Sequence, residues 1–386
     1  MHLDFISKLY YEGQSNYIDT IKRLLYKKDS SIFQKLDFYK NEIYLNPLLF
    51  SFFTLENYQL NITLDQILYS DLPVNSKLNV NSDKYGIIYL SGYGYLLNVD
   101  KNTKFIFDKN KFKLYTLGSN VMVNYDYKPL NIIDNANIEL SIYSNPYLEK
   151  LIESYIQNSN NFSKHEHIYL VNKHKNDIKK ALNIIEEVIP DFYKLILDST
   201  KNIFLYENQN IRSFVTRKCH GTIFLSVDDK SNITYFLEEI IHQCGHNIFN
   251  SVTFNVNEFI QISENTNLGS LIKNNDSRTI YDALHGVFTV STGTQILYEV
   301  YNKIDLGDDE LNKELLARLA IKSKRFRTGI ERIRFNEIFT EKGKIIYDIL
   351  DKKCEQIITN NKDIFNKFNF SNQPPVFSYE MFKKVN

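Results

Sequence analysis

Residues 234–250, TYFLEEIIHQCGHNIFN, have two faces of different character when they are written as a helix. At roughly 100° per residue, five apolar side chains fall on one side and form a stripe that a helix buries against a core. This stripe consists of Leu237, Ile240, Ile241, Cys244 and Ile248. The opposite side carries His242 and His246, flanked by Tyr235, Glu238, Glu239 and Phe249. The chain must therefore pack around one face of this helix, and the other face is predicted to line a polar cavity.

The two histidines have the spacing of metal ligands. Side chains at i and i+4 of a helix project in the same direction, so His242 and His246 can bind one ion. Gln243 stands where the metallopeptidase motif H-E-x-x-H has its catalytic glutamate. Because an amide cannot take a proton from a metal-bound water, zinc-dependent peptide hydrolysis is disfavoured, while both metal ligands are retained. A chance pair of histidines on a solvated face is the alternative.

Composition excludes several classes of protein. A chain of 386 residues can form two domains, and its 46 basic and 46 acidic residues leave no net charge for nucleic-acid binding. Three scattered cysteines, Cys219, Cys244 and Cys354, argue against a disulfide framework. The N-terminal residues do not resemble a signal peptide, and no apolar stretch is long enough to span a membrane. We therefore expect a cytoplasmic protein with neither nucleic-acid nor membrane partners.

The hydrophobic period changes along the chain and predicts an α+β fold. Residues 1–57 contain three amphipathic segments that predict helices, whereas residues 58–145 contain short β-branched and aromatic runs that predict an antiparallel β module. The rest is mainly helical, with three short strands that predict an antiparallel meander before the histidine helix. We expect an N-terminal helical and β module over residues 1–150 and a metal-binding catalytic domain over residues 151–386. The module could hold an extended peptide by strand addition, or its sheet could simply pack its own core.

A second helix repeats the division into an aliphatic and a polar face. It is predicted to begin at an Asp276/Ser277 cap and to continue to about Ile304, after a polar stretch typical of an active-site loop. Its aliphatic face is Ile280, Ala283, Leu284 and Val287. The polar side carries Arg278, Tyr281, Asp282, His285, Thr289 and Thr292. Arg278 and His285 are nearly aligned, about 10 Å apart along the helix axis.

Another group of histidines lies earlier in the chain. His165, Glu166, His167 and His174 fall at the start of a predicted helix among serine, lysine and asparagine residues. A hydrophilic setting of this kind favours a solvated surface over a metal site. We therefore expect the metal chemistry to reside in the later helices.

His242, His246 and His285 can be assembled into one site with Arg278 beside it. Three protein ligands leave coordination positions open, and a metal needs such positions to bind oxygen and a bidentate co-substrate. A guanidinium group at the end of the pocket suits the far carboxylate of 2-oxoglutarate.

Residues from about 165 to 350 resemble a known family, the HExxH-motif peptide-modification proteins encoded near ribosomally synthesised peptide precursors. The matching pieces are the helix that ends at Pro190, IRSFVTRKCHGTIFLS, FLEEIIHQCGH, RTIYDALHG and TEKGKIIYDIL. Arg278 and the LHG sequence of residues 284–286 extend the match beyond the metal motif. The resemblance covers about half of the chain, and Gln243 departs from the family's glutamate.

The resemblance implies iron(II)- and 2-oxoglutarate-dependent β-hydroxylation of a residue in a precursor peptide. By similarity, His242, His246 and His285 bind iron and Arg278 contacts 2-oxoglutarate. The candidates that shape the pocket are Tyr281, Asp282, Thr289, Ser213 and Thr216. Two alternatives remain, a zincin-like zinc hydrolase and a catalytically silent peptide-binding partner.

Overall fold

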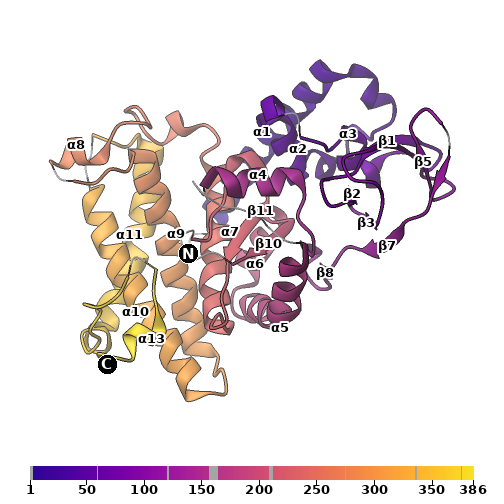
Figure 1. Cartoon of the computed structure of the whole chain (residues 1–386). Coiled ribbons are helices and arrows are strands. Elements are labelled where there is room, and N and C mark those ends of the chain that lie inside the picture. Colours follow the sequence, from indigo (N-terminus) through magenta and orange to yellow (C-terminus); the bar gives the residue numbers. More distant parts are fainter. Residues whose placement is uncertain are drawn as a thin grey trace. The chain divides into compact units, whose positions relative to one another are not determined.

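The computed structural model describes residues 3–58, 60–119, 121–155, 164–207, 212–273, 275–334, 337–374 and 376–386. The chain packs as two compact units (Figure 1). The helical unit consists of residues 1–14, 176–199 and 229–386, and the β unit consists of residues 15–175 and 200–228. Both units combine segments that are distant in the sequence, which differs from the single boundary predicted near residue 150.

The α+β fold class is confirmed. Helices α1 (Leu3–Lys28) and α5 (Lys164–Val188) contribute residues to both units. The helical unit also contains α6 (Pro190–Ser199), α7 (Ile233–Val252), η6 (Val256–Glu258), α8 (Leu268–Ile272), α9 (Ile280–Lys303), α10 (Asp309–Arg332), α11 (Glu341–Asn360), α12 (Lys362–Phe365) and α13 (Tyr379–Phe382). The helices of the β unit are η1 (Ser30–Gln34), η2 (Asn41–Leu45), α2 (Pro47–Thr54), η3 (Glu56–Tyr58), α3 (Leu64–Ile67), η4 (Tyr69–Asp71), α4 (Pro146–Tyr155) and η5 (Arg217–Cys219).

Two antiparallel sheets form most of the module predicted from residues 58–145, but the strands at residues 132–133 and 138–140 belong to a third sheet with parallel pairing. One sheet has the order β1-β4-β5-β6, with β1 (Lys77–Asn81), β4 (Lys104–Asp108), β5 (Lys113–Thr116) and β6 (Met122–Val123). The other has the order β2-β3-β7, with β2 (Ile88–Leu90), β3 (Gly94–Leu97) and β7 (Asp126–Pro129). In β1, buried Leu78 and Val80 alternate with more exposed residues, and Val80 pairs with buried Phe105. The period-2 pattern is therefore satisfied by one buried face.

A third sheet corrects the predicted meander. Its order is β11-β10-β9-β8, with β8 (Ile132–Ile133), β9 (Ile138–Leu140), β10 (Asn202–Tyr206) and β11 (Thr222–Ser226). Strand β10 is parallel to both β9 and β11, and Phe214, between β10 and β11 in the sequence, forms an isolated antiparallel bridge with Phe224. The antiparallel prediction was wrong because β10 and β11 are apolar on both faces, and apolar strands of this kind suit parallel pairing.

The helix predicted between residues 30 and 45 is also corrected. Two short 3-10 helices, η1 and η2, occupy this stretch. Asp29 accepts a hydrogen bond from the Ser31 backbone N–H, and Asp37 accepts one from the Tyr39 N–H. Side chains that bind the backbone locally compete with continuous helix, which explains the interruption.

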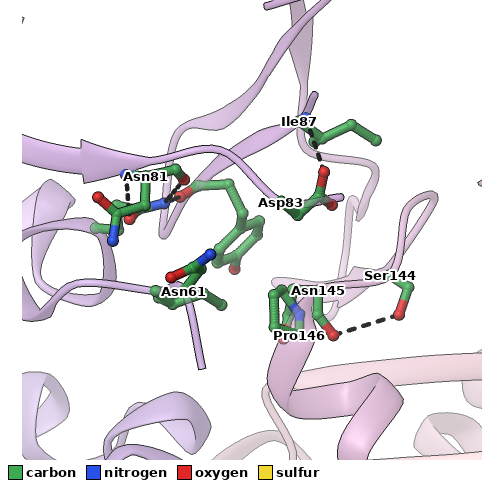
Figure 2. A pocket seen from close by; sticks show the side chains of 10 residues that line it. Asn61, Asn81, Asp83, Ile87, Ser144, Asn145 and Pro146 are labelled. Carbon is green, nitrogen blue, oxygen red and sulfur yellow. Dashed lines mark hydrogen bonds between the residues drawn. The ribbon is translucent and has the colours of Figure 1, made fainter. Parts of the chain in front are cut away.

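A small polar cavity lies in the β unit (Figure 2). Its lining includes Asn61, Asn81, Asp83, Ser144 and Asn145. The cavity has room for about one water molecule. None of the residues predicted to bind metal or co-substrate lines it.

In the helical unit, α9 packs against α7, α10 and α11 (Figure 1). All five residues of the predicted stripe on α7 are fully buried. The exposed fractions of Ile280 and Ala283 on α9 are 1 % or less. Helix α9 begins at Ile280 rather than at the predicted Asp276/Ser277 cap, because Thr279 caps it by accepting from the Asp282 N–H. Within the described ranges, the helices lack the combination of length and apolar character that a membrane span requires.

The N-terminal part of α1 packs closely on the end of α7. Gln14 donates from Nε2 to the Ser251 Oγ at 2.8 Å, and a β-carbon at Gly13 would collide with the Ser251 carbonyl oxygen. Only a glycine permits this approach.

We expect Gly13→Ala to lower the free energy of unfolding by about 2 kcal/mol or more, because the new methyl group must push α1 away from α7. Glu12→Ala, on the exposed face of the same helix, is the control and is expected to change stability by less than about 0.5 kcal/mol. Urea denaturation of both variants measures the difference. Equal stability of the two would show that α1 does not depend on this contact.

Candidate metal centre

Helix α7 places the side chains of His242 and His246 next to each other. Its first turn is capped by Asn232, whose side-chain oxygen accepts from the backbone N–H groups of Thr234 and Tyr235. Further along, the Nε2 atoms of His242 and His246 lie 3.3 Å apart. The i, i+4 spacing therefore produces the convergence that was predicted.

The third predicted ligand, His285, reaches the same place from α9. Its ring centroid lies 4.4 Å from that of His246 and 5.0 Å from that of Phe249. Tyr281, one turn earlier on α9, packs on His285 at 5.5 Å. The structure thus groups three imidazoles that are separated by up to 43 residues in the sequence.

A small residue allows α7 and α9 to approach each other. A β-carbon at Gly245 would lie 3.5 Å from the Thr289 Cγ2, which is ordinary contact distance. A longer side chain at residue 245 would hold the two helices apart and separate His246 from His285. Gly245 therefore sets the separation on which the histidine group depends.

The imidazoles of His242 and His246 are held in the neutral form that binds metals. Burial lowers the pKa of His242 well below its ordinary value, and the positive charge of Lys322 lowers it further. The same two causes lower the pKa of His246 to about 4. His242, His246 and His285 are intermediate in exposure as whole residues, and the His242 Nδ1 and His285 Nε2 atoms are buried. At neutral pH the rings of His242 and His246 need not lose a proton before they bind an ion.

His242 and His246 have the separation of two ligands on one metal ion. Two nitrogen ligands at about 2.1 Å from one ion lie roughly 3.0–3.4 Å apart, depending on the coordination geometry. The 3.3 Å between His242 and His246 falls in this interval. In the part of the chain that the structure describes, no group of three or more His, Cys, Asp or Glu side chains is placed so that it could hold a metal ion. The fit therefore rests on the pair, and the ring of His285 packs against that of His246.

The buried side chain of Gln243 forms a hydrogen bond within its own helix. It is 2 % exposed, and its Nε2 donates to the Glu239 Oε2 at 3.1 Å, one turn back on the same helix. The amide is thus hydrogen-bonded along α7, and it supplies no general base to the two histidines.

A buried ionic network ties α7 to α10 beside the histidines. Glu238 accepts from the Arg318 Nη1 at 2.7 Å and pairs with the Lys322 Nζ at 3.0 Å. Arg318 also pairs with Glu314 at 2.5 Å. Lys322 passes over Gly293 of α9, where a β-carbon would lie 3.0 Å from its Cδ. Two positive and two negative charges balance within this network.

The sequence contains a signal for this network that the sequence analysis missed. Glu314, Arg318 and Lys322 recur at intervals of four on α10, next to the apolar residues Leu315 and Leu319. Charges that follow the edge of an apolar stripe are usually read as solvated. Here the side chains of Arg318 and Lys322 are only 7 % and 4 % exposed.

The predicted co-substrate residues have partners of their own. Arg278 forms a two-point ion pair with Asp276, at 2.9 Å from Nε and 2.7 Å from Nη2. The Tyr281 hydroxyl lies 3.0 Å from that of Thr253. Thr289 is fully buried, and its hydroxyl donates to carbonyl groups of its own helix.

Two further candidates, Ser213 and Thr216, belong to the β unit. The Ser213 Oγ accepts from the Ser226 N–H at 3.1 Å. Thr216 caps η5 by accepting from the Lys218 N–H. Both hydroxyls thus support local structure.

The second histidine group is corrected in part. His167 and His174 are 1 % and 2 % exposed, so the predicted solvated surface is wrong for both. The His167 Nδ1 lies 3.1 Å from the Leu205 carbonyl oxygen, and its ring packs on Phe204. The polar neighbours in the sequence were a poor guide because α5 turns His167 towards β10 and buries His174 as well. The side chains of His165 and Glu166 lie outside the described residues.

Comparison with known proteins gives no matching family model and no matching curated protein. The neutral imidazoles of His242 and His246 have the spacing of two metal ligands, and two ligands from the chain leave coordination positions open. The nearby amide provides no base for hydrolysis.

The ion pairs of Glu238 should make the free energy of unfolding depend on pH. Burial raises the pKa of Glu238, but Lys322 and Arg318 together outweigh burial and lower it from 4.5 to about 2. The ion pairs therefore stabilise the fold fully above about pH 4.5 and lose this effect as the pH falls through about 2. Between pH 6 and pH 2 the wild type should lose on the order of 3 kcal/mol more unfolding free energy than Glu238→Gln.

Urea denaturation at a series of pH values measures this difference. Glu341→Gln, whose side chain is 89 % exposed, serves as the control and should follow the wild type. Parallel pH profiles of Glu238→Gln and wild type would contradict the prediction.

Proposed function

We propose that this protein is an iron(II)- and 2-oxoglutarate-dependent hydroxylase that acts on a β-carbon in a ribosomally synthesised precursor peptide. The observation that carries the proposal is the convergence of His242 and His246 at 3.3 Å, with His285 packed against them. An all-imidazole group with open positions suits a metal that must bind both oxygen and a chelating co-substrate.

The surroundings of the histidines support oxidation over hydrolysis. Hydrolysis at a metal needs a base that takes a proton from water, and Gln243 is an amide bonded to Glu239. Oxidation by a keto-acid-dependent metal needs no such base. The sequence resemblance, in which Arg278 and the residues after Leu284 match beyond the motif, points in the same direction.

Each residue has a part in the proposed reaction. His242, His246 and His285 hold the metal, and Arg278 orients the far carboxylate of 2-oxoglutarate. Iron(II) and 2-oxoglutarate, when bound, supply the oxidising chemistry, in which one atom of O₂ enters a peptide C–H bond and the other enters succinate as carbon dioxide leaves. Phe249 is fully buried against His285 and excludes water from that side of the ring.

Anaerobic titration with Fe(II) and then 2-oxoglutarate tests the proposal. The wild type should bind about one Fe(II) and then develop the weak visible charge-transfer band of a chelated keto acid. His285→Ala should lose the band, because a ligand that contacts His246 is removed. His165→Ala is the control and should behave as wild type.

Other outcomes of this titration decide between the alternatives. Metal binding without a band would contradict the proposed co-substrate and favour the zinc hydrolase. If no metal binds to the wild type, the catalytically silent peptide-binding partner is favoured instead.

Gln243→Glu provides a separate test of the hydrolytic alternative. We expect no peptidase activity, and we expect a loss of about 1–3 kcal/mol of stability, because a second carboxylate would be buried against Glu239. Gln243→Met removes the amide without adding charge and is the matched control. Zinc-dependent cleavage of a peptide by Gln243→Glu would overturn the oxidative assignment.

A further inference from the structure

The guanidinium group of Arg278 belongs to a cluster of three charges. The Asp276 Oδ2 accepts from the Arg278 Nη2 at 2.7 Å and from the Arg332 Nη1 at 3.1 Å. Arg332 is the last residue of α10, so the cluster joins residues that are more than fifty positions apart. The sequence motifs give no indication that Arg332 lies near Arg278.

The backbone holds this cluster in a defined place. The Leu268 N–H donates to the Arg278 carbonyl oxygen at 2.8 Å, and the Gly269 N–H donates to that of Asp276 at 2.9 Å. The Ile280 N–H donates to the Thr266 carbonyl oxygen at 2.9 Å. These bonds fix the segment that leads into α9, and with it the direction from which Arg278 extends. A binding group held in this way need not be ordered when a ligand arrives.

The charges of the cluster do not cancel. Asp276 supplies one negative charge and is 6 % exposed in its side chain, whereas Arg278 and Arg332 supply two positive charges and are 40 % and 43 % exposed. The solvent-exposed part of the three-residue cluster therefore consists of its two guanidinium groups, which can bind an incoming anion. The exposed carboxylate of Asp282 also acts electrostatically on Arg278.

One edge of Arg278 faces the part of α9 that carries the metal ligand. Its Nη1 forms no hydrogen bond with any residue that the structure describes, and it lies 3.7 Å from the position of a β-carbon on Gly286. Gly286 directly follows His285. The absence of a side chain at Gly286 leaves room beside this edge for a ligand group.

We propose that Arg332 is a second cationic residue of the co-substrate site and makes the site selective for 2-oxo acids with two carboxylates. This inference rests on the proposed function. Arg278 and Arg332 bind the far carboxylate from two sides, and Asp276 positions Arg278 through its two-point ion pair. A 2-oxo acid with only one carboxylate gains nothing from Arg332.

The alternative is that Arg332 merely attaches the end of α10 to the segment before α9. A half-exposed ion pair contributes little to stability, about 0–1 kcal/mol. Stability alone therefore does not separate the two roles, but ligand selectivity does. A structural attachment would affect both kinds of 2-oxo acid alike.

The test compares the dissociation constants of 2-oxoglutarate and 2-oxobutyrate for the Fe(II)-loaded protein without oxygen. The variants are Arg332→Gln, which removes the charge, and Arg332→Lys, which keeps it. Arg327→Gln is the matched control, because Arg327 lies on α10, is also 43 % exposed and pairs with Glu355 at 2.8 Å. Titration calorimetry gives the constants, and thermal denaturation verifies that each variant is folded.

We expect Arg332→Gln to weaken 2-oxoglutarate about tenfold, the effect of losing one half-exposed charged hydrogen bond. Arg332→Lys should stay within about threefold of wild type, since it retains the charge without the fork. Binding of 2-oxobutyrate and of Fe(II) should not change in any variant, and Arg327→Gln should match the wild type throughout.

Unchanged 2-oxoglutarate binding by Arg332→Gln would overturn the role of Arg332 while leaving the proposed function intact. Equal weakening of both 2-oxo acids would overturn it as well and favour the structural attachment. If the Fe(II)-loaded wild type binds no 2-oxoglutarate, the proposed function itself fails and the inference fails with it.

Discussion

The close contact between α7 and α9 is the constraint on which the site depends. Gly245 lies against Thr289, and this separation lets His246 and His285 touch at 4.4 Å between ring centroids. Fully buried aliphatic side chains on the other face of α7 supply the packing that holds the helix there. The polar side chains between α7 and α9 can be accommodated there only because the apolar face of α7 is completely buried.

Charge balance allows the charged side chains beside the histidines to be buried inside the helical unit. Glu238, one turn before His242, is neutralised by Lys322 and Arg318, so that no isolated charge is buried. The uncompensated loss of either partner would leave a charge in a dry environment, at a cost of about 3–5 kcal/mol. The same positive charge of Lys322 helps to keep the nearby imidazoles neutral, which links the stability of the helix pair to the readiness of the histidines for a metal.

The approach to α9 is organised by a second, more exposed set of charges. Asp276 forms ion pairs with Arg278 and Arg332. The N-cap of α9 is Thr279 instead. The predicted helix start was early because the Asp276 carboxylate accepts from the Arg278 backbone N–H and from two guanidinium groups, all before α9 begins at its Thr279 cap. The proposed co-substrate site thus owes its cationic character to residues from two segments, one of which carries no motif.

Several features of this protein could be predicted from the sequence alone, because they depend only on residues that are close together along the chain. The aliphatic stripe of α7 and the i, i+4 histidines follow from helical geometry, and the class α+β follows from the change of period. The polar face predicted for α9 was wrong in part, since Thr289 and Thr292 are buried and Arg278 precedes the helix. Tertiary structure alone decided which segments pack together: the parallel pairing of β10, the burial of His167 and the meeting of Arg332 with Asp276. The reason is physical, because periodicity records that a side chain is buried or exposed but carries no information about the partner that covers it.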